Sequence, residues 1–251
     1  MNLKLLSYNI RFGGTRRESQ LAEVIRTVAP DLVVFQEGTD PRVIEKLASE
    51  TELPYWAAQR AHSIAYISRV KIGYHEWHYP AGAKHSFLEI VPAGTEARIF
   101  GLHLSARFSK WSERQRGREI RSLLKGIERH QHGFHVLVGD FNTLAPGELL
   151  DVRKMPAWIK ALVWISGRDI QRETIQVMLD AGYADGFRLL HPDIKGYTFP
   201  VWDPHLRLDY VFVPALYAER LKACDVVEHP SVANASDHFP LLTQLEIGSD
   251  S

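Results

Sequence analysis

This sequence of 251 residues has one cysteine, a formal net charge of zero and no long apolar run. Its single cysteine, Cys224, excludes an internal disulfide framework and a cysteine-based zinc site. The 30 Lys and Arg residues balance the 30 Asp and Glu residues, so the formal net charge is zero. A whole-molecule field that would attract nucleic acid or an anionic membrane is therefore absent, and any anion attraction must come from local patches.

Membrane-spanning and secretory segments are also missing from the pattern. No run approaches the roughly 18 apolar residues of a spanning helix. The segment 1–6 turns polar at Ser7 before a signal-peptide core could form. We therefore expect a cytoplasmic protein, and nothing in the sequence indicates an obligate protein partner.

The composition supports a sizeable core, because 45% of the residues are hydrophobic. The length suits one large layered domain or two small ones. We find no internal repeat, low-complexity segment or linker. The sequence therefore predicts a single domain over residues 1–247 and a short frayed tail over 248–251.

Strands are predicted where apolar, β-branched and aromatic residues cluster between Gly and Pro. Four of these segments are short and closely spaced enough to suggest hairpins. The predicted strands are 3–10, 31–37, 63–69, 71–77, 87–91, 98–104, 136–139, 206–213 and 241–247.

Helices are predicted where apolar residues recur with a period near 3.6. Thr15 with Glu18, and Ser112 with Gln115, have the spacing of capping boxes. Asp40 and Pro41 suit the cap and first position of a short helix. The predicted helices are 15–28, 41–50, 112–129 and, within the helical pattern of 144–182, the segments 156–165 and 174–179.

The chain is organised around the segment 136–143, where an apolar strand ends at Gly139. Asp140 and Asn142 follow, two residues apart and so on one face. An aspartate can bind a metal, orient water or take a proton, and an asparagine amide can donate to a developing oxyanion. Both residues also form ordinary turns, so this segment alone leaves a structural and a catalytic interpretation open.

Polar side chains end other apolar runs in the same way. Asn9, Glu37, His103 and Asp209 do so, and the pair 237–238 (Asp-His) lies in the loop before the last strand. Catalytic and ligand-binding residues commonly lie at strand ends and in the loops beyond them. Acid, amide and imidazole groups together suit phosphodiester hydrolysis. A hard cation, Mg²⁺ or Mn²⁺, on Glu37 and Asn9 would polarise the phosphate.

Six motifs carry a resemblance to a known family. They are Tyr8-Asn9-Ile10-Arg11, Gln36-Glu37, Gly101-Leu102-His103-Leu104-Ser105, Gly139-Asp140-Phe141-Asn142, Leu208-Asp209-Tyr210 and Ser236-Asp237-His238. In this order they resemble the endonuclease/exonuclease/phosphatase superfamily, the deoxyribonuclease I-like proteins. The resemblance implies an α/β (α+β) fold, a four-layer sandwich of two central mixed β-sheets flanked by helices. It also implies cleavage of phosphoester bonds with a divalent metal, Mg²⁺ or Mn²⁺.

The resemblance also implies a metal site. Glu37 resembles the principal metal ligand of the family, with Asn9 as its polar neighbour. Asp237 resembles an acid on the metal side.

Catalytic roles follow from the same motifs. Asp140 and Asn142 resemble the pair that orients the nucleophilic water and holds the phosphate. Asp209 resembles the carboxylate that orients His238. His103 matches the second histidine of the deoxyribonuclease-like and sphingomyelinase-like branches.

Two positions bear on the branch of the family. The abasic-site repair branch has an acidic residue two positions after the asparagine, where this sequence has Arg11, and this favours the other branches. In the deoxyribonuclease branch the counterpart of His103 has a glutamate partner. Our alignment places His62 at that position.

Nucleic acid is the preferred substrate, DNA or RNA, because basic residues recur along the helix after His103. Such a stripe suits a phosphate backbone, although charged helix faces are commonly just solvated. A phospholipid or other phosphoester is the alternative, since the segment Trp158–Ile165 could rest on a lipid interface, wall the site or pack in the core. A catalytically inactive binding module is a third possibility. The stripe comprises Arg114, Arg118, Arg121, Lys125 and Arg129, and the substrate-binding candidates are Arg11, Arg107, Arg114, Arg118 and Arg121.

Overall fold

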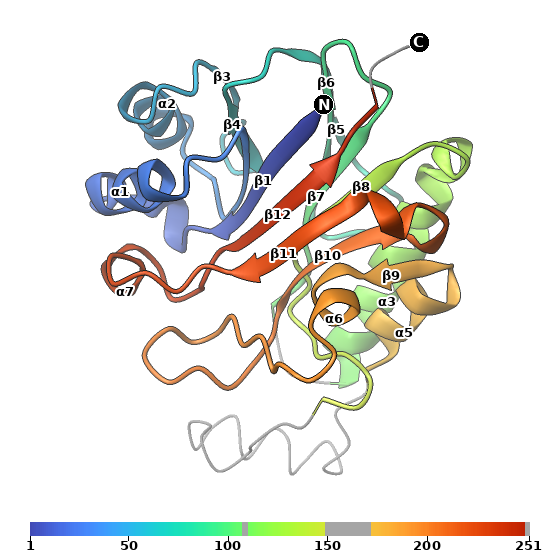
Figure 1. Ribbon diagram of the computed structural model, residues 1–251. Helices are drawn as coiled ribbons and strands as arrows, with labels where there is room; N and C mark the ends of the chain where they lie inside the picture. Colours follow the sequence, from blue (N-terminus) through green and yellow to red (C-terminus); the bar gives the residue numbers. More distant parts are fainter. Residues whose placement is uncertain (107–109, 149–171, 249–251) are drawn as a thin grey trace.

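Two six-stranded β-sheets lie face to face, with helices against their outer faces, in the computed structural model (Figure 1). The structure describes residues 1–106, 110–148 and 172–248. The arrangement confirms the predicted four-layer sandwich of two mixed sheets.

The first sheet has the strand order β11-β12-β1-β2-β4-β3. The parallel pair β1–β2 is central, and the remaining neighbours in this sheet are antiparallel. Its strands are β1 (Asn2–Asn9), β2 (Leu32–Gln36), β3 (Tyr55–Ala57), β4 (Ala65–Ser68), β11 (Leu221–Val226) and β12 (Leu241–Glu246).

The second sheet has the order β5-β6-β7-β8-β10-β9, again with a parallel pair, β7–β8, near its centre. Its strands are β5 (Ile72–His78), β6 (Phe87–Pro92), β7 (Arg98–His103), β8 (His135–Asp140), β9 (Tyr183–Asp185) and β10 (Asp209–Pro214).

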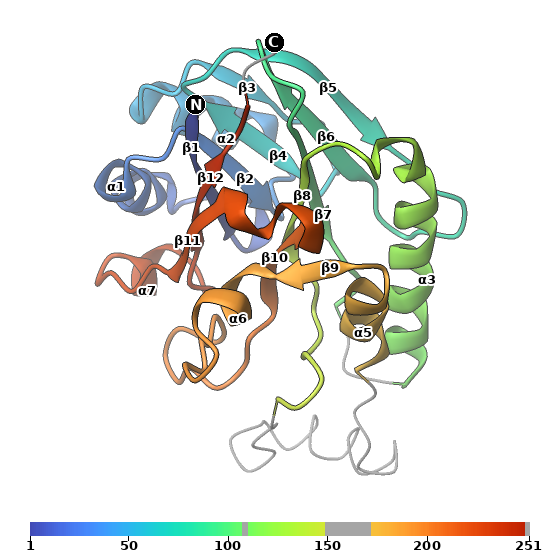
Figure 2. The same cartoon turned by 45° about the vertical axis from the view of Figure 1, so that its right-hand side comes forward.

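Helices cover the two outer faces, as Figures 1 and 2 show. The apolar faces of α1 and α2 pack on the first sheet, and those of α3 and α5 pack on the second. Asp40 caps α2, because its carboxylate accepts the Arg42 N–H at 3.1 Å, as predicted. The helices are α1 (Glu18–Val28), α2 (Pro41–Glu50), α3 (Lys110–Gly126), α5 (Glu173–Asp180), α6 (Gly186–Leu190) and α7 (Val232–Ala235).

A third apolar cluster fills the space between the sheets, where Val34, Ile90 and Val211 are fully buried. A Cβ on Gly101 would lie 2.6 Å from Val34 Cγ1, so this glycine permits the close approach of the sheets. Gly139 has a φ of 148°, and a Cβ there would lie 1.9 Å from the Leu102 carbonyl oxygen. Only glycine therefore fits directly before Asp140.

Several local predictions were wrong. The segments 63–69 and 71–77 do not form a hairpin, because β4 pairs with β2 in the first sheet whereas β5 pairs with β6 in the second. Both predicted capping boxes fail, since α1 begins at Glu18 without a side-chain cap and α3 begins at Lys110. Short pieces such as β3, β9 and β11 lacked a periodic signal.

Among the described helices, none is both long enough and apolar enough to cross a membrane.

Candidate active site

The strand pairing brings the predicted site residues to one end of the sandwich. Asn9 pairs with Gln36 at the ends of β1 and β2, and His103 pairs with Asp140 at the ends of β7 and β8. The antiparallel β10 begins there, with Asp209 opposite Asp140. The side chains that meet at this end are Asn9, Glu37, His103, Asp140, Asn142, Asp209 and His238, with Asp237 beside them.

Asp140 is the centre of this cluster, with 1% of its surface exposed. Its Oδ2 accepts the Asn9 amide N–H at 3.0 Å and lies 3.6 Å from His103 Nε2 and 3.9 Å from His238 Nε2. Burial raises the pKa of this carboxyl to about 7, because it outweighs the lowering effect of His238. Asp140 can therefore accept a proton near neutral pH.

His238 is held by Asp209. The Nδ1–H of the imidazole donates to Asp209 Oδ2 at 2.8 Å. The Phe199 ring packs against the imidazole, with 4.8 Å between the ring centroids. Burial alone would lower the pKa of His238. The charge and hydrogen bond of Asp209, with the charge of Asp140, overcome that effect and raise the pKa to about 10. The dyad predicted from the motifs is thus formed, and its imidazole is cationic at neutral pH.

Glu37 presents a carboxylate beside Asp140, and the Asn9 amide nitrogen links the two carboxylates, while Asn9 Oδ1 accepts the Arg11 N–H at 2.9 Å. Glu37 Oε1 and Asp140 Oδ2 share the Asn9 amide nitrogen, at 3.4 and 3.0 Å. Glu37 Oε2 accepts the Phe12 N–H at 2.6 Å, and the Glu37 backbone has a φ of 58°. Carboxylates that converge on one shared donor suit a hard divalent cation.

A metal ion fits this set of side chains. Glu37 offers a carboxylate beside Asn9, as the resemblance implied. Asp140, Asp209 and His238 also form a cluster whose ligand atoms all lie within 4.8 Å of one another. Asp237 lies further out, with Oδ2 3.2 Å from the Nε of Arg11, whose side chain is 42% exposed.

Asn142 supports Asp140 more directly than the motif indicated. Its backbone N–H donates to Asp140 Oδ1 at 2.9 Å, and its side-chain amide donates to the Leu104 carbonyl oxygen at 3.0 Å. Its φ of 52° is a conformation that asparagine tolerates better than most residues. The turn orients the Asp140 carboxylate, so the structural role of Asn142 is compatible with the catalytic interpretation.

The partner of His103 is Ser63, which sequence reasoning missed. Ser63 Oγ lies 2.5 Å from His103 Nδ1 and accepts the Glu37 N–H at 3.2 Å. His62, the predicted counterpart of the glutamate, instead contacts Ser86 at 3.2 Å and the Tyr79 hydroxyl. Burial lowers the pKa of His103 to about 4, although the charge of Glu37 opposes this. His103 is therefore neutral where His238 is charged.

Ser236 links two of the motifs. Its hydroxyl donates to the Asn9 carbonyl oxygen at 2.6 Å and accepts the His238 N–H at 3.4 Å. The Arg17 guanidinium donates to the carbonyl oxygens of Ile10 and Ala235 nearby. These bonds hold the loop after β1 to the loop before β12. Ser236 belongs to one of the six motifs, whereas no pattern in the sequence indicated Arg17.

The basic stripe lies on α3, the helix whose first turn contacts the loop after Asp140. Glu113, in the first turn of α3, accepts the hydroxyl of Thr143, the residue after Asn142, at 2.8 Å. Arg114, Arg118, Arg121 and Lys125 are exposed along α3. Arg121 is also paired with Glu173 at 2.6 Å. The helix ends at Gly126, so Arg129 lies outside it, on a 3₁₀ turn (Glu128–His130).

Three other candidates have different outcomes. Arg107 and the segment Trp158–Ile165 lie outside the described residues. Arg207, which directly precedes the Leu208-Asp209-Tyr210 motif, is 1% exposed and pairs with Glu148 and Asp185, each at 2.6 Å. It is therefore structural.

Comparison with known proteins agrees with this geometry. The sequence profile of the Endonuclease/Exonuclease/phosphatase family matches residues 6–238, and the chain belongs to that family. The family and the fold make it a phosphoester hydrolase of the deoxyribonuclease I-like type. A search of curated protein sequences found no match.

Similar solved structures cover nearly the whole chain. The 3′-5′ exonuclease NExo from Neisseria meningitidis is 21% identical, with a TM-score of 0.71 over 97% of this chain and 100% of its own. A 3′ phosphatase NExo variant bound to a product DNA hairpin gives a TM-score of 0.69 at 21% identity, over 97% and 99% of the two chains. An AP endonuclease from Archaeoglobus fulgidus gives 0.69 at 18% identity, over 97% and 99%. At these identities the likeness establishes the fold.

Proposed function

We propose that the protein is a Mg²⁺- or Mn²⁺-dependent phosphodiesterase that acts on nucleic acid, most simply DNA. The observation that carries the proposal is the pairing of a buried carboxylate of raised pKa, Asp140, with a cationic imidazole, His238, 3.9 Å away. One group is suited to take a proton from water, and the other to stabilise charge on a phosphate.

Each residue of the cluster has its own role in the proposed hydrolysis. Asp140 holds the attacking water and accepts its proton, while the Asn142 N–H fixes the carboxylate. His238, kept cationic by Asp209, donates a hydrogen bond to a non-bridging phosphate oxygen as negative charge builds there. His103, neutral and bonded to Ser63 through Nδ1, donates its Nε2–H to the same phosphate.

Glu37 would hold the divalent cation, with Asn9 beside it. A bound cation supplies charge to the phosphate and to the leaving oxygen. The chain's own contribution is to fix Glu37 through the Phe12 N–H and the shared Asn9 amide before substrate arrives. Such preorganisation avoids reorientation during the reaction.

A nucleic-acid substrate is supported by the stripe on α3, which starts beside the loop that carries Asn142. At about 1.5 Å per residue, Arg121 lies roughly 10 Å further along the helix than Arg114. A polynucleotide strand extending from the site can follow such a row, whereas a small phosphoester cannot reach it. The NExo relative solved with a product DNA hairpin has the same fold.

The experiment is a turnover screen with and without Mg²⁺ or Mn²⁺. The substrates are bis-p-nitrophenyl phosphate, single- and double-stranded DNA, RNA, sphingomyelin and phosphoinositides. We expect cation-dependent cleavage of the chromogenic diester and of a nucleic acid, and none of the lipids. Preferred turnover of a lipid would replace the nuclease assignment with the phospholipid alternative.

The cation requirement is tested by Glu37→Gln, which should lose cation-dependent turnover while melting like the wild type. Glu52→Gln is the matched control, because Glu52 is exposed and has a similar φ of 56°. Full wild-type activity after exhaustive EDTA treatment would refute the metal dependence.

A further inference from the structure

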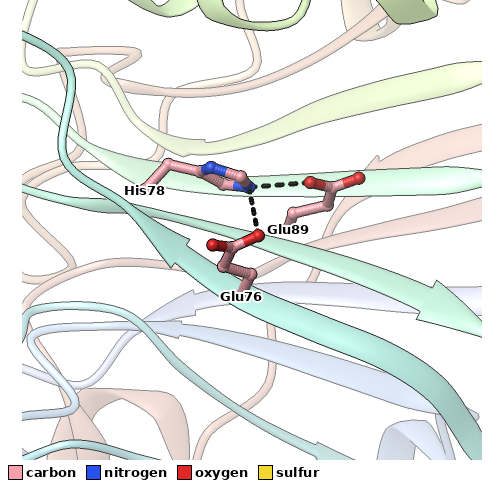
Figure 3. Close-up of side chains that lie close together, drawn as sticks. All are labelled: Glu76, His78 and Glu89. Atoms are coloured by element: carbon pink, nitrogen blue, oxygen red, sulfur yellow. Dashed lines mark hydrogen bonds and ion pairs between the residues drawn. The ribbon is translucent and has the colours of Figure 1, made fainter.

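A second cluster of ligating side chains lies on the outer face of the second sheet, away from the active site. Glu76 on the edge strand β5 stands directly opposite Glu89 on β6 in the strand register. Figure 3 shows both carboxylates turned toward the imidazole of His78. Like charges at directly opposed positions repel, so a cation bound between the two carboxylates would relieve their repulsion.

The three side chains present one ligand atom each to a common point. His78 Nε2 lies 2.7 Å from Glu89 Oε2 and 3.9 Å from Glu76 Oε2 (Figure 3). These ligand atoms all lie within 4.8 Å of one another. A tetrahedral zinc with bonds of about 2.0–2.1 Å separates its ligands by roughly 3.3–3.4 Å. The observed separations bracket that value, and small side-chain rotations suffice to reach it.

Surrounding groups hold the ligands in place. The Arg98 guanidinium binds Glu89 Oε1, which leaves Oε2 toward His78. The Tyr74 hydroxyl donates to Glu76, and the His78 ring stacks on Phe87 with 5.1 Å between ring centroids. Metal ligands are commonly fixed by such outer partners.

The charge at this cluster favours a divalent ion. Glu89 is 1% exposed, and Arg98 offsets only one of the two carboxylates. The cluster opens on a pocket of about 170 Å³ that His78, Glu89 and His130 line. His130 Nε2 lies 3.8 Å from Glu89 Oε1 and accepts the Arg129 Nε–H at 2.9 Å, so its lone pair is engaged in that hydrogen bond. It lies outside the set of three mutually close ligand atoms, so it can become a fourth ligand only if its side chain rotates and Arg129, which is exposed, turns away.

We propose that Glu76, His78 and Glu89 form a Zn²⁺ site, with His130 or water in the fourth position. Imidazole with carboxylate is a ligand set that suits zinc, in contrast to the oxygen donors around Glu37. The ion would tie the edge strand β5 to β6 and to the 3₁₀ turn after α3. The site is structural and independent of the proposed hydrolysis.

The test is calorimetric titration of metal-free protein with ZnCl₂, in excess Mg²⁺, for the wild type and two variants. His78→Phe removes the ligand but retains a ring for the stack on Phe87. His132→Phe makes the same change at an exposed histidine. We expect His78→Phe to weaken binding by on the order of 100-fold, since loss of even an outer partner costs about 10–100-fold. Zn²⁺ should raise the Tm of the wild type and the control only.

Two further variants make the outcome decisive. Glu76→Gln, half exposed and so tolerant of change, should weaken Zn²⁺ binding even if His78→Phe fails to fold. Asp209→Asn disrupts the catalytic cluster and should leave this zinc affinity unchanged. The proposal is overturned if the wild type binds no Zn²⁺, or if binding is lost in Asp209→Asn and retained in Glu76→Gln.

Discussion

Replacing Asp209 by Asn tests the electrostatics of the site most directly. The substitution keeps the shape of the side chain but removes the charge 2.8 Å from His238 Nδ1. Without that charge, burial of the imidazole dominates and favours its neutral form. His238 can then no longer offer a cation to the phosphate. Loss of acid–base chemistry of this kind costs about 10²–10⁴-fold in kcat.

The same change alters stability in a pH-dependent way. The pKa of His238 in the folded state is about 10, above the ordinary value of 6.5. Its protonation therefore stabilises the fold fully below pH 6.5, and this stabilisation disappears as the pH rises through about 10. The pKa difference corresponds to roughly 5 kcal/mol at low pH and roughly 3 kcal/mol near pH 8. These free energies are upper bounds on the contribution of the Asp209 charge to stability, because Asp140 and Asp237 also raise the pKa of His238.

The assay combines kcat for bis-p-nitrophenyl phosphate with denaturant unfolding at about pH 6 and at a pH above 10. Asp225→Asn is the matched control, because Asp225 pairs with His191 at 3.1 Å in a largely exposed position. We expect Asp209→Asn to destabilise far more at the lower pH, and the control to change little at either. The reasoning is refuted if kcat stays within about threefold, roughly half a kcal/mol, or if the destabilisation is the same at both pH values.

Three further predictions concern single features of the site. Ser63→Ala should lower kcat by on the order of tenfold, which corresponds to the loss of about one hydrogen bond. In ¹⁵N NMR the His103 imidazole of this variant should no longer show one dominant tautomer. Ser63→Thr should retain both the wild-type kcat and the single tautomer. Asp140→Asn should abolish turnover yet raise the unfolding free energy near pH 8 by up to about 4 kcal/mol. The reason is that the protonated carboxyl stabilises the fold below pH 3.8, and this stabilisation is lost as the pH rises through about 7. An unfolding free energy that does not increase in chemical denaturation near pH 8 would contradict this prediction. Arg118→Glu with Arg121→Glu should weaken binding of long DNA and flatten its salt dependence by roughly 0.7–0.9 per lost contact, while hydrolysis of the small diester stays unchanged.

The central strands of the fold could be predicted because their apolar runs are long and bounded by Gly or Pro. β2 is buried along its whole length, as its unbroken apolar run indicated. The sheet to which each strand belongs could not be predicted. The chain crosses between the sheets after β4, and only long-range pairing of β4 with β2 determines this. Neighbouring strands in a sequence usually pair, so the hairpin was a reasonable but wrong expectation.

In the candidate site, too, the sequence predicted which residues come together but not all of their contacts. Asn9, His103 and Asp140 could be placed because each ends an apolar strand, and the ends of parallel strands meet at one edge; Asp209 instead begins the antiparallel strand β10, and His238 precedes β12. The partner of His103 depended instead on the irregular segment before β4, where two neighbouring side chains point to different partners and no sequence period predicts which one faces the imidazole. Ser63 faces the imidazole, while His62 turns to Ser86 and Tyr79. A glutamate partner would favour the imidazolium, whereas a serine partner leaves His103 neutral, with a pKa near 4. The two buried histidines therefore differ in charge at neutral pH, with His103 neutral and His238 cationic.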